Sequence, residues 1–172
     1  MANNYFEIFQ LKPEINIDLA KLEEQYLLLQ SQFHPDKFVN APISAQNKAI
    51  SNSMVINQAY KILKNDLKRA AYWLKITGDI DLENEQNKFK LSPVILMEIM
   101  ELSEEFNEVD ADERLNLAKK IKQEIAANLA LIAGFINQKQ FEKAAQNLAK
   151  AKYLQNIIES VPLGHADSTL NI

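Results

Sequence analysis

The sequence predicts an all-α protein, with an N-terminal helical hairpin flanked by short helices and a C-terminal antiparallel three-helix bundle. Only 3 of the 172 residues are glycine, and β-branched residues rarely follow one another. Both features favour helices over a sheet with many turns. Apolar residues recur at steps of three and four through most of the chain, which is the spacing of one helix face.

The first expected elements are a short helical segment and a longer helix. Apolar residues cluster over residues 5–11 and stop at Pro13, which predicts one or two helical turns. Asp18 can cap the next helix, because its carboxylate accepts from free backbone N–H groups. The stripe of that helix stops at His34-Pro35, since proline disfavours helix at the residue before it. The stripe consists of Leu19, Leu22, Tyr26, Leu29 and Phe33.

A loop and two more helices are expected to complete the first domain, residues 1–78. Residues 36–44 contain Pro42 and are predicted to be a loop. A last short helix, about 67–77, should end at Gly78, a common helix stop. The helix between them repeats the spacing of three and four, with Ala49, Ser53, Ile56, Tyr60 and Leu63.

The second half of the chain is expected to be a separate helical domain. Residues 79–91 are polar and acidic and are predicted to be a linker, partly docked through Leu82, Phe89 and Leu91. Ser92-Pro93 is a typical helix start. The domain should cover 92–162 and leave 163–172 as a flexible tail. Its helices are expected at about 93–107, 111–137 and 139–160, which suits an antiparallel three-helix bundle.

Composition excludes several classes of function. A net charge of −4 disfavours general nucleic-acid binding. The chain has no cysteine, so it cannot hold a cluster or zinc through thiolates, and His34 and His165 lie too far apart to suggest a metal site or cofactor. No apolar run reaches membrane-spanning length, and the first residues lack a signal segment. A bacterial cytoplasmic location is expected, with a mature organellar form left open.

The sharpest motif is the tripeptide His34-Pro35-Asp36, which directly follows the first long helix. Three residues alone recur by chance. Together with the aromatic start 5–9 and the segment 56–60 (Ile-Asn-Gln-Ala-Tyr), the tripeptide resembles the J-domain family. The resemblance implies that the tripeptide contacts a DnaK-type chaperone at its nucleotide-domain and linker region and promotes ATP hydrolysis there. It implies chaperone contacts for His34, Pro35, Asp36, Lys37 and Lys21.

The chain departs from the family in the charge of the helix before the tripeptide. That helix is commonly basic in J-domains, whereas here Lys21 is its only base. Electrostatic steering toward the chaperone should therefore be weak. Lys37 and four later bases could contribute, although such residues more commonly form a solvated charged face. The later bases are Lys61, Lys64, Lys68 and Arg69. No Gly/Phe-rich segment follows, so a general chaperone for unfolded clients is not expected.

The helix at about 93–107 carries more apolar residues than one packed face needs. Its core-like stripe is Ile95, Ile99, Leu102 and Phe106. On the other side fall Leu96, Met97 and Met100, beside Glu101, Glu104 and Glu108. An apolar patch rimmed by one sign of charge is typical of a partner-binding surface, and Tyr153 of the last helix could join it. Alternatively, Leu96 and Met100 pack beneath another helix or the linker, and Tyr153 is an ordinary half-exposed tyrosine.

These features together narrow the resemblance to the HscB family, the J-type co-chaperones of iron–sulfur cluster assembly. The resemblance rests on the J motif, on the segment 69–74 and on the run 96–106. It implies a co-chaperone without a cofactor that delivers an IscU-type scaffold to a dedicated HscA-like chaperone and stimulates its ATPase. A monomer is expected, since no large spare apolar surface demands a dimer. The residues implied in scaffold binding are Leu96, Met97, Met100, Glu101, Glu104, Glu108 and Tyr153.

Three other interpretations stay open on the sequence. The chain could be a J-protein with a different client, because the tripeptide does not identify the client. It could also be a helical adaptor in which the tripeptide is accidental. An enzyme is least expected: the glutamates around Glu101 could mimic a carboxylate metal site, but no Glu-x-x-His pair completes a di-iron bundle and no nucleophile–base constellation is visible.

Overall fold

Every regular element of the computed structural model, which describes residues 4–82 and 91–161, is a helix, and this confirms the all-α prediction. The N-terminal part contains α1 (Tyr5–Ile8), α2 (Leu19–Phe33), the short 3-10 helix η1 (Pro35–Phe38), α3 (Ile43–Lys64) and α4 (Asp66–Gly78). The C-terminal part contains α5 (Pro93–Glu108), α6 (Ala111–Asn137) and α7 (Phe141–Ser160).

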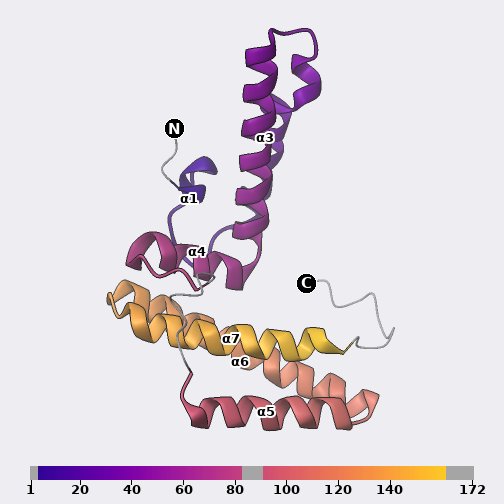
Figure 1. Cartoon of the computed structure of the whole chain (residues 1–172), viewed down its shortest axis with the longest axis vertical. Helices are drawn as coiled ribbons and strands as arrows, with labels where there is room; N and C mark the ends of the chain where they lie inside the picture. Colours follow the sequence, from indigo (N-terminus) through magenta and orange to yellow (C-terminus); the bar gives the residue numbers. More distant parts are fainter. Residues whose placement is uncertain (1–3, 83–90, 162–172) are drawn as a thin grey trace.

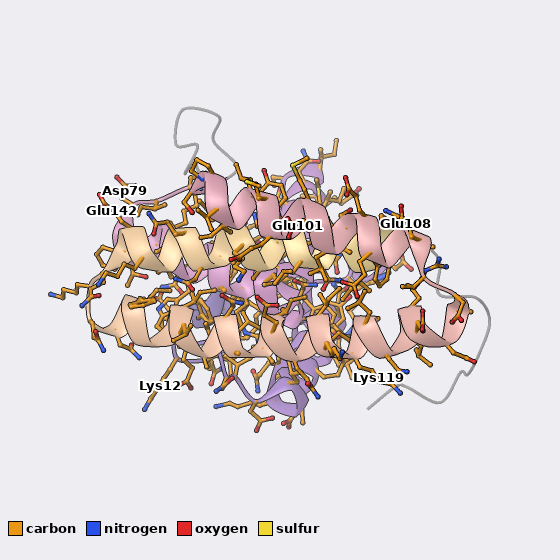
Figure 2. The ribbon with its side chains drawn as sticks, turned by 90° about the horizontal axis from the view of Figure 1, so that it is seen from below. Lys12, Asp79, Glu101, Glu108, Lys119 and Glu142 are labelled. Atoms are coloured by element: carbon orange, nitrogen blue, oxygen red, sulfur yellow. The ribbon has the colours of Figure 1, made fainter. Side chains whose placement is uncertain are left out.

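The two parts have different shapes. Helices α2 and α3 form an antiparallel hairpin that rises from the three bundle helices and runs across their direction (Figure 1). Seen from below, α5, α7 and α6 lie side by side along their lengths, and α6 runs opposite to the other two (Figure 2). The fold is therefore the predicted hairpin with short flanking helices and an antiparallel three-helix bundle.

Side-chain caps fix where most of these helices begin. Asp18 accepts a hydrogen bond from the N–H of Lys21 at 3.0 Å, and Ser92 accepts from the N–H of Ile95 at 3.3 Å, as the sequence predicted. Each such cap satisfies one backbone donor that the helix leaves free. Residues 36–44 are more regular than the loop that was predicted there. The helix η1 begins at Pro35, and α3 begins directly after Pro42.

Helix α4 connects the hairpin to the bundle. Its Ala70, Trp73 and Leu74 are buried, and the helix packs against α3 as well as against α6 and α7. The buried apolar residues of both parts form one continuous cluster through α4. Of the docked linker positions expected, Leu91 is buried and Leu82 packs against this cluster, while Phe89 lies outside the described residues, as does the segment 163–172.

Gly78 has a different role from the helix stop expected. It is the last residue of α4, and the left-handed conformation that ends the helix belongs to Asp79, with φ 54°. A Cβ on Gly78 would lie 2.6 Å from the Cγ of Phe141, at the start of α7. Glycine is therefore needed here because the backbone of α4 touches the Phe141 ring.

We predict that Gly78→Ala destabilises the protein, because the added methyl group overlaps the Phe141 ring, and overpacking costs about 1–3 kcal/mol. The matched control is Gly134→Ala in α6, where nothing lies within 4 Å of the added Cβ. That change should leave stability unchanged or raise it by about 0.5–1 kcal/mol through helix propensity. Thermal denaturation of both variants measures these effects. Equal melting temperatures would show that the contact with Phe141 does not require glycine at position 78.

Candidate functional site

The His34-Pro35-Asp36 turn lies at the free end of the hairpin, with its polar side chains in solvent. The side chains of His34 and Asp36 are 51% and 86% exposed. The Nδ1 atom of His34 accepts from the N–H of Asp36 at 3.4 Å, and the N–H of Lys37 donates to the His34 carbonyl at 3.1 Å. The turn thus presents an imidazole and a carboxylate on a backbone fixed by Pro35 and these two hydrogen bonds.

Four of the five residues implied in chaperone contact are brought together, and one is not. The turn and η1 hold four of them in consecutive positions, from His34 to Lys37. Lys21 is exposed in the first turn of α2, about 20 Å away along the helix axis at 1.5 Å per residue. A partner seated on the turn reaches Lys21 only if it also covers the length of α2.

The segment around Asn57 holds the two hairpin helices together. The rings of Tyr26 and Tyr60 stack with centroids 4.0 Å apart. Asn57 Oδ1 accepts from the Tyr26 hydroxyl at 3.0 Å and from Gln30 Nε2 at 2.5 Å, and the Tyr60 hydroxyl donates to Glu23. These contacts fix the register of α2 against α3 and so the place of the turn at their end.

The patch predicted on α5 is exposed. Leu96 is 37% exposed, Met97 61%, Met100 62% and Tyr153 47%, whereas Ile99 and Phe106 are buried. Met100 is therefore not packed beneath another helix and Leu96 is covered only in part, whereas linker residues 83–90, which the alternative also named, lie outside the described residues. A groove of about 350 Å³ runs between α5 and α7, and Leu96 and Met100 line it from one side and Tyr153 from the other.

The exposed face of α5 that carries Met97 and Met100 is acidic beside this groove. Glu101, Glu104 and Glu108 are exposed, and α5 contains no lysine, arginine or histidine to balance them. Figure 2 shows Glu101 and Glu108 along α5. Among the described residues, no group of three or more acidic, histidine or cysteine side chains is placed to hold a metal ion.

Comparison with known proteins assigns both parts of the chain to known domain families. Residues 4–72 match the model of the DnaJ domain, and residues 91–162 match that of the HSCB C-terminal oligomerisation domain. A co-chaperone protein HscB homolog from Vibrio vulnificus is 34% identical over 169 residues, which cover 93% of this chain and 95% of the relative. The chain belongs to the HscB co-chaperone family.

Solved structures of the HscB family have the same fold. The chaperone HscB from Vibrio cholerae superposes with a TM-score of 0.78 at 30% identity, covering 91% of this chain and 94% of that one. Human co-chaperone HscB superposes with a TM-score of 0.83 at 28% identity, covering 92% of this chain and 80% of that one. The J-domain and the helical bundle of this family therefore account for nearly the whole chain.

One basic residue expected on the chaperone-facing surface is buried instead. Arg69 is 3% exposed; its Nε donates to the carbonyl of Ile15 at 2.7 Å, and its guanidinium also binds the Leu63 carbonyl and Asp66. The expectation that Arg69 contributes to chaperone binding is therefore wrong. In this HscB-family chain it joins α4 to the loop before α2.

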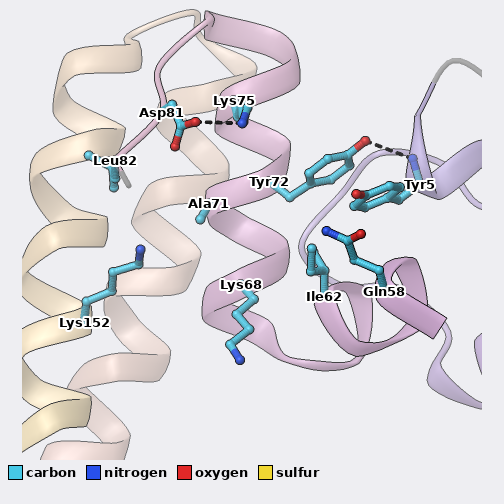
Figure 3. A pocket seen from close by; sticks show the side chains of 10 residues that line it. All are labelled: Tyr5, Gln58, Ile62, Lys68, Ala71, Tyr72, Lys75, Asp81, Leu82 and Lys152. Carbon is cyan, nitrogen blue, oxygen red and sulfur yellow. Dashed lines mark hydrogen bonds and ion pairs between the residues drawn. The ribbon is translucent and has the colours of Figure 1, made fainter. Parts of the chain in front are cut away.

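A second junction attaches α1 to α4. Tyr5 stacks on Tyr72 with ring centroids 4.4 Å apart, and the Tyr5 N–H donates to the Tyr72 hydroxyl at 3.0 Å (Figure 3). Burial raises the pKa of the Tyr72 phenol above its usual value. Lys75 and Asp81 form an ion pair at 2.6 Å beside this stack, at the start of the predicted linker.

The sequence did not indicate the polar residues that line the α5–α7 groove. Beside Tyr153, α7 contributes Asn156 and Ser160, and α5 contributes Ser103. Asn156 and Ser160 follow Tyr153 at three and seven residues, so the same helical spacing would have found them once Tyr153 was placed on the patch. The groove thus combines apolar walls with hydrogen-bonding groups.

We predict that replacing both Leu96 and Met100 with alanine changes the melting temperature little, because both side chains are exposed. The control is Leu154→Ala on α7, where the side chain is 1% exposed and truncation should cost about 2–5 kcal/mol. Thermal denaturation of both variants makes the comparison. If the double variant lost as much stability as Leu154→Ala, the patch would belong to the core.

Proposed function

We propose that this HscB-family protein binds an IscU-type iron–sulfur scaffold and delivers it to an HscA-like DnaK-type chaperone, whose ATPase it stimulates. The observation that carries the proposal is the presence of two exposed surfaces of different chemistry on one core. One is the turn with His34 and Asp36 at the hairpin end, and the other is the groove with Leu96, Met100 and Tyr153 on the bundle.

The turn is suited to contact with a basic group on the chaperone. The Asp36 carboxylate is almost fully exposed and can pair with an arginine of the partner in the bidentate geometry that such pairs favour. Pro35 and the bond from the Asp36 N–H to His34 limit the conformations of the turn, so little entropy is lost on binding. Lys37, and Lys21 if the partner covers α2, would add favourable charge.

The groove is suited to an apolar segment with basic neighbours. Leu96 and Met100 offer adaptable apolar contacts, and the Tyr153 ring stands on the opposite wall. Glu101, Glu104 and Glu108 would pair with basic side chains at the edge of the scaffold and guide its approach. The cluster itself is cargo: the chain has no cysteine, so the thiolate ligands would come from the scaffold.

Two further points belong to the proposal. The bacterial relatives from Vibrio and Neisseria favour the bacterial cytoplasm as the compartment. Within the described residues no helix has the length and apolarity needed to cross a membrane. A J-protein with a different client would share the turn but not the scaffold-binding groove, so binding to purified scaffold separates the two functions.

The turn is tested by His34→Gln and Asp36→Asn. Stimulation of the HscA-like ATPase should fall to near the unstimulated rate, because each change removes a group aimed at the partner. Helix content and melting should stay almost unchanged, since both positions are exposed. Glu24→Gln, an exposed change on α2, is the control and should keep full stimulation. Normal stimulation by both turn variants would exclude the J-domain mechanism.

The groove is tested by calorimetry with purified IscU-type scaffold. Leu96→Ala with Met100→Ala should weaken binding more than about tenfold, the effect of losing about 2 kcal/mol at an apolar anchor. Val94→Ala is the control, because Val94 is 66% exposed on the same helix but does not line the groove. Wild-type affinity of the double variant would mean that the client is not held by this groove.

The acidic rim should act mainly on the rate of binding. Glu101→Gln with Glu104→Gln should slow association and reduce its dependence on salt, because rim charges steer a partner more than they hold it. Stopped-flow association at low and high salt measures both effects. A large increase in the dissociation rate alone would place these glutamates in direct buried contact with the scaffold.

A further inference from the structure

One side of the α2–α3 hairpin exposes large apolar side chains that neither the turn nor the groove uses. Leu27 is 58% exposed, Ile43 75%, Ile50 45% and Met54 67%. Single exposed apolar residues are common, but several on one side of an element are typical of an interaction surface. The helix geometry and the contacts between α2 and α3 place these four residues on one side of the hairpin.

On α3, three of these residues share a stripe that borders α2. At 100° per residue, Ile43, Ile50 and Met54 fall within about 60° of one another and of Asn57. Asn57 accepts the hydrogen bond from Gln30 of α2, so this stripe lies at the edge where the two helices meet. The apolar residues therefore extend from that hydrogen bond toward the free end of the hairpin.

On α2, the matching stripe ends at the turn. Leu27 and His34 lie at i−3 and i+4 from Gln30, which places both on the side of α2 that reaches Asn57. His34 is the residue at which α2 ends and the exposed turn begins. Leu27, Ile43, Ile50 and Met54, here called the hairpin stripe, thus lie on the same side of the hairpin as His34.

The hairpin stripe is neutral along its middle, and Glu23, at i−4 from Leu27, and Lys61, at i+7 from Met54, border it on the side of the bundle. From residue 25 to 33 on α2, and from 49 to 60 on α3, the sequence contains no charged side chain. Lys48 lies about 160° from Ile50 around α3, on the far side. Between these bordering charges the surface offers an acidic partner no cation, but it can bury apolar area against an apolar partner.

We propose that the hairpin stripe docks on an apolar face of the HscA-like DnaK-type chaperone, directly beside the site that the His34–Asp36 turn contacts. This inference rests on the proposed function. The chaperone is the occupant because the stripe is continuous with His34, so a partner seated on the turn covers the stripe as well. The contact is driven by burial of apolar surface, and its strength depends little on salt, unlike contacts between surface charges.

The test compares two double variants in the ATPase assay with purified HscA-like chaperone. Leu27→Ser with Met54→Ser removes apolar surface from the stripe. Leu28→Ser with Val55→Ser is the matched control: these neighbouring residues are 48% and 46% exposed and lie about 100° around the same helices from Leu27 and Met54, off the stripe. The concentration for half-maximal stimulation should rise at least about tenfold for the stripe variant and change less than about twofold for the control.

The same assay is repeated for the wild type and the stripe variant between about 50 and about 500 mM KCl, a range over which contacts between exposed charges are strongly screened. The ratio of their half-maximal concentrations should change less than about threefold, because the charged contacts of the turn are common to both proteins. A change of more than about tenfold in this ratio, or an unaffected stripe variant beside an inactive Asp36→Asn variant, would overturn the inference and leave the proposed function standing. A wild type that fails to stimulate would instead refute the proposed function.

A second copy of this chain is the competing occupant of the stripe. Sedimentation of the wild type and of the stripe variant distinguishes it from the chaperone. A dimer that the stripe variant abolishes, with stimulation unchanged, would assign the stripe to self-association and overturn the inference. A monomer at all concentrations, together with the loss of stimulation, supports the chaperone contact.

Discussion

The packing of α4 against the bundle is the constraint on which the rest of the structure depends. This helix contacts α3 on one side and α6 and α7 on the other, and its Trp73 and Leu74 are buried in the apolar cluster that both parts share. At its end Gly78 lets the backbone touch the ring of Phe141. Because dense packing leaves few alternative arrangements, this contact fixes the direction in which the hairpin leaves the bundle.

Because the hairpin is held rigidly, the turn and the groove keep a constant distance and orientation relative to each other. The tyrosine stack of Tyr26 and Tyr60 and the bonds to Asn57 set the register of α2 against α3, and Arg69 ties α4 to the segment before α2. The turn therefore stands at one end of a rigid chain of contacts, and the groove between α5 and α7 stands at the other. Such an arrangement suits a protein that holds one partner while it presents it to another.

Local patterns predicted much of this, and long-range contacts account for what they missed. Spacing alone predicted which side of α5 is buried and which is exposed. The apolar stripe with Ile99 and Phe106 packs in the core, and Met100 is left on the exposed side. The burial of Arg69 did not follow, because one of its acceptors is the carbonyl of Ile15, 54 residues away. The contact of Gly78 with Phe141 likewise joins residues whose proximity no periodicity reveals.

The distance between the two surfaces reports directly on the rigidity of the junction at α4. The chain has no cysteine, so single cysteines at Asn40, beyond the turn, and at Asn107, near the end of α5, can carry spin labels without background. Double electron–electron resonance should give one narrow distance distribution, which Gly78→Ala broadens and Gly134→Ala does not. A broad distribution in the wild type would contradict the rigid junction, because the turn and the groove would then move independently.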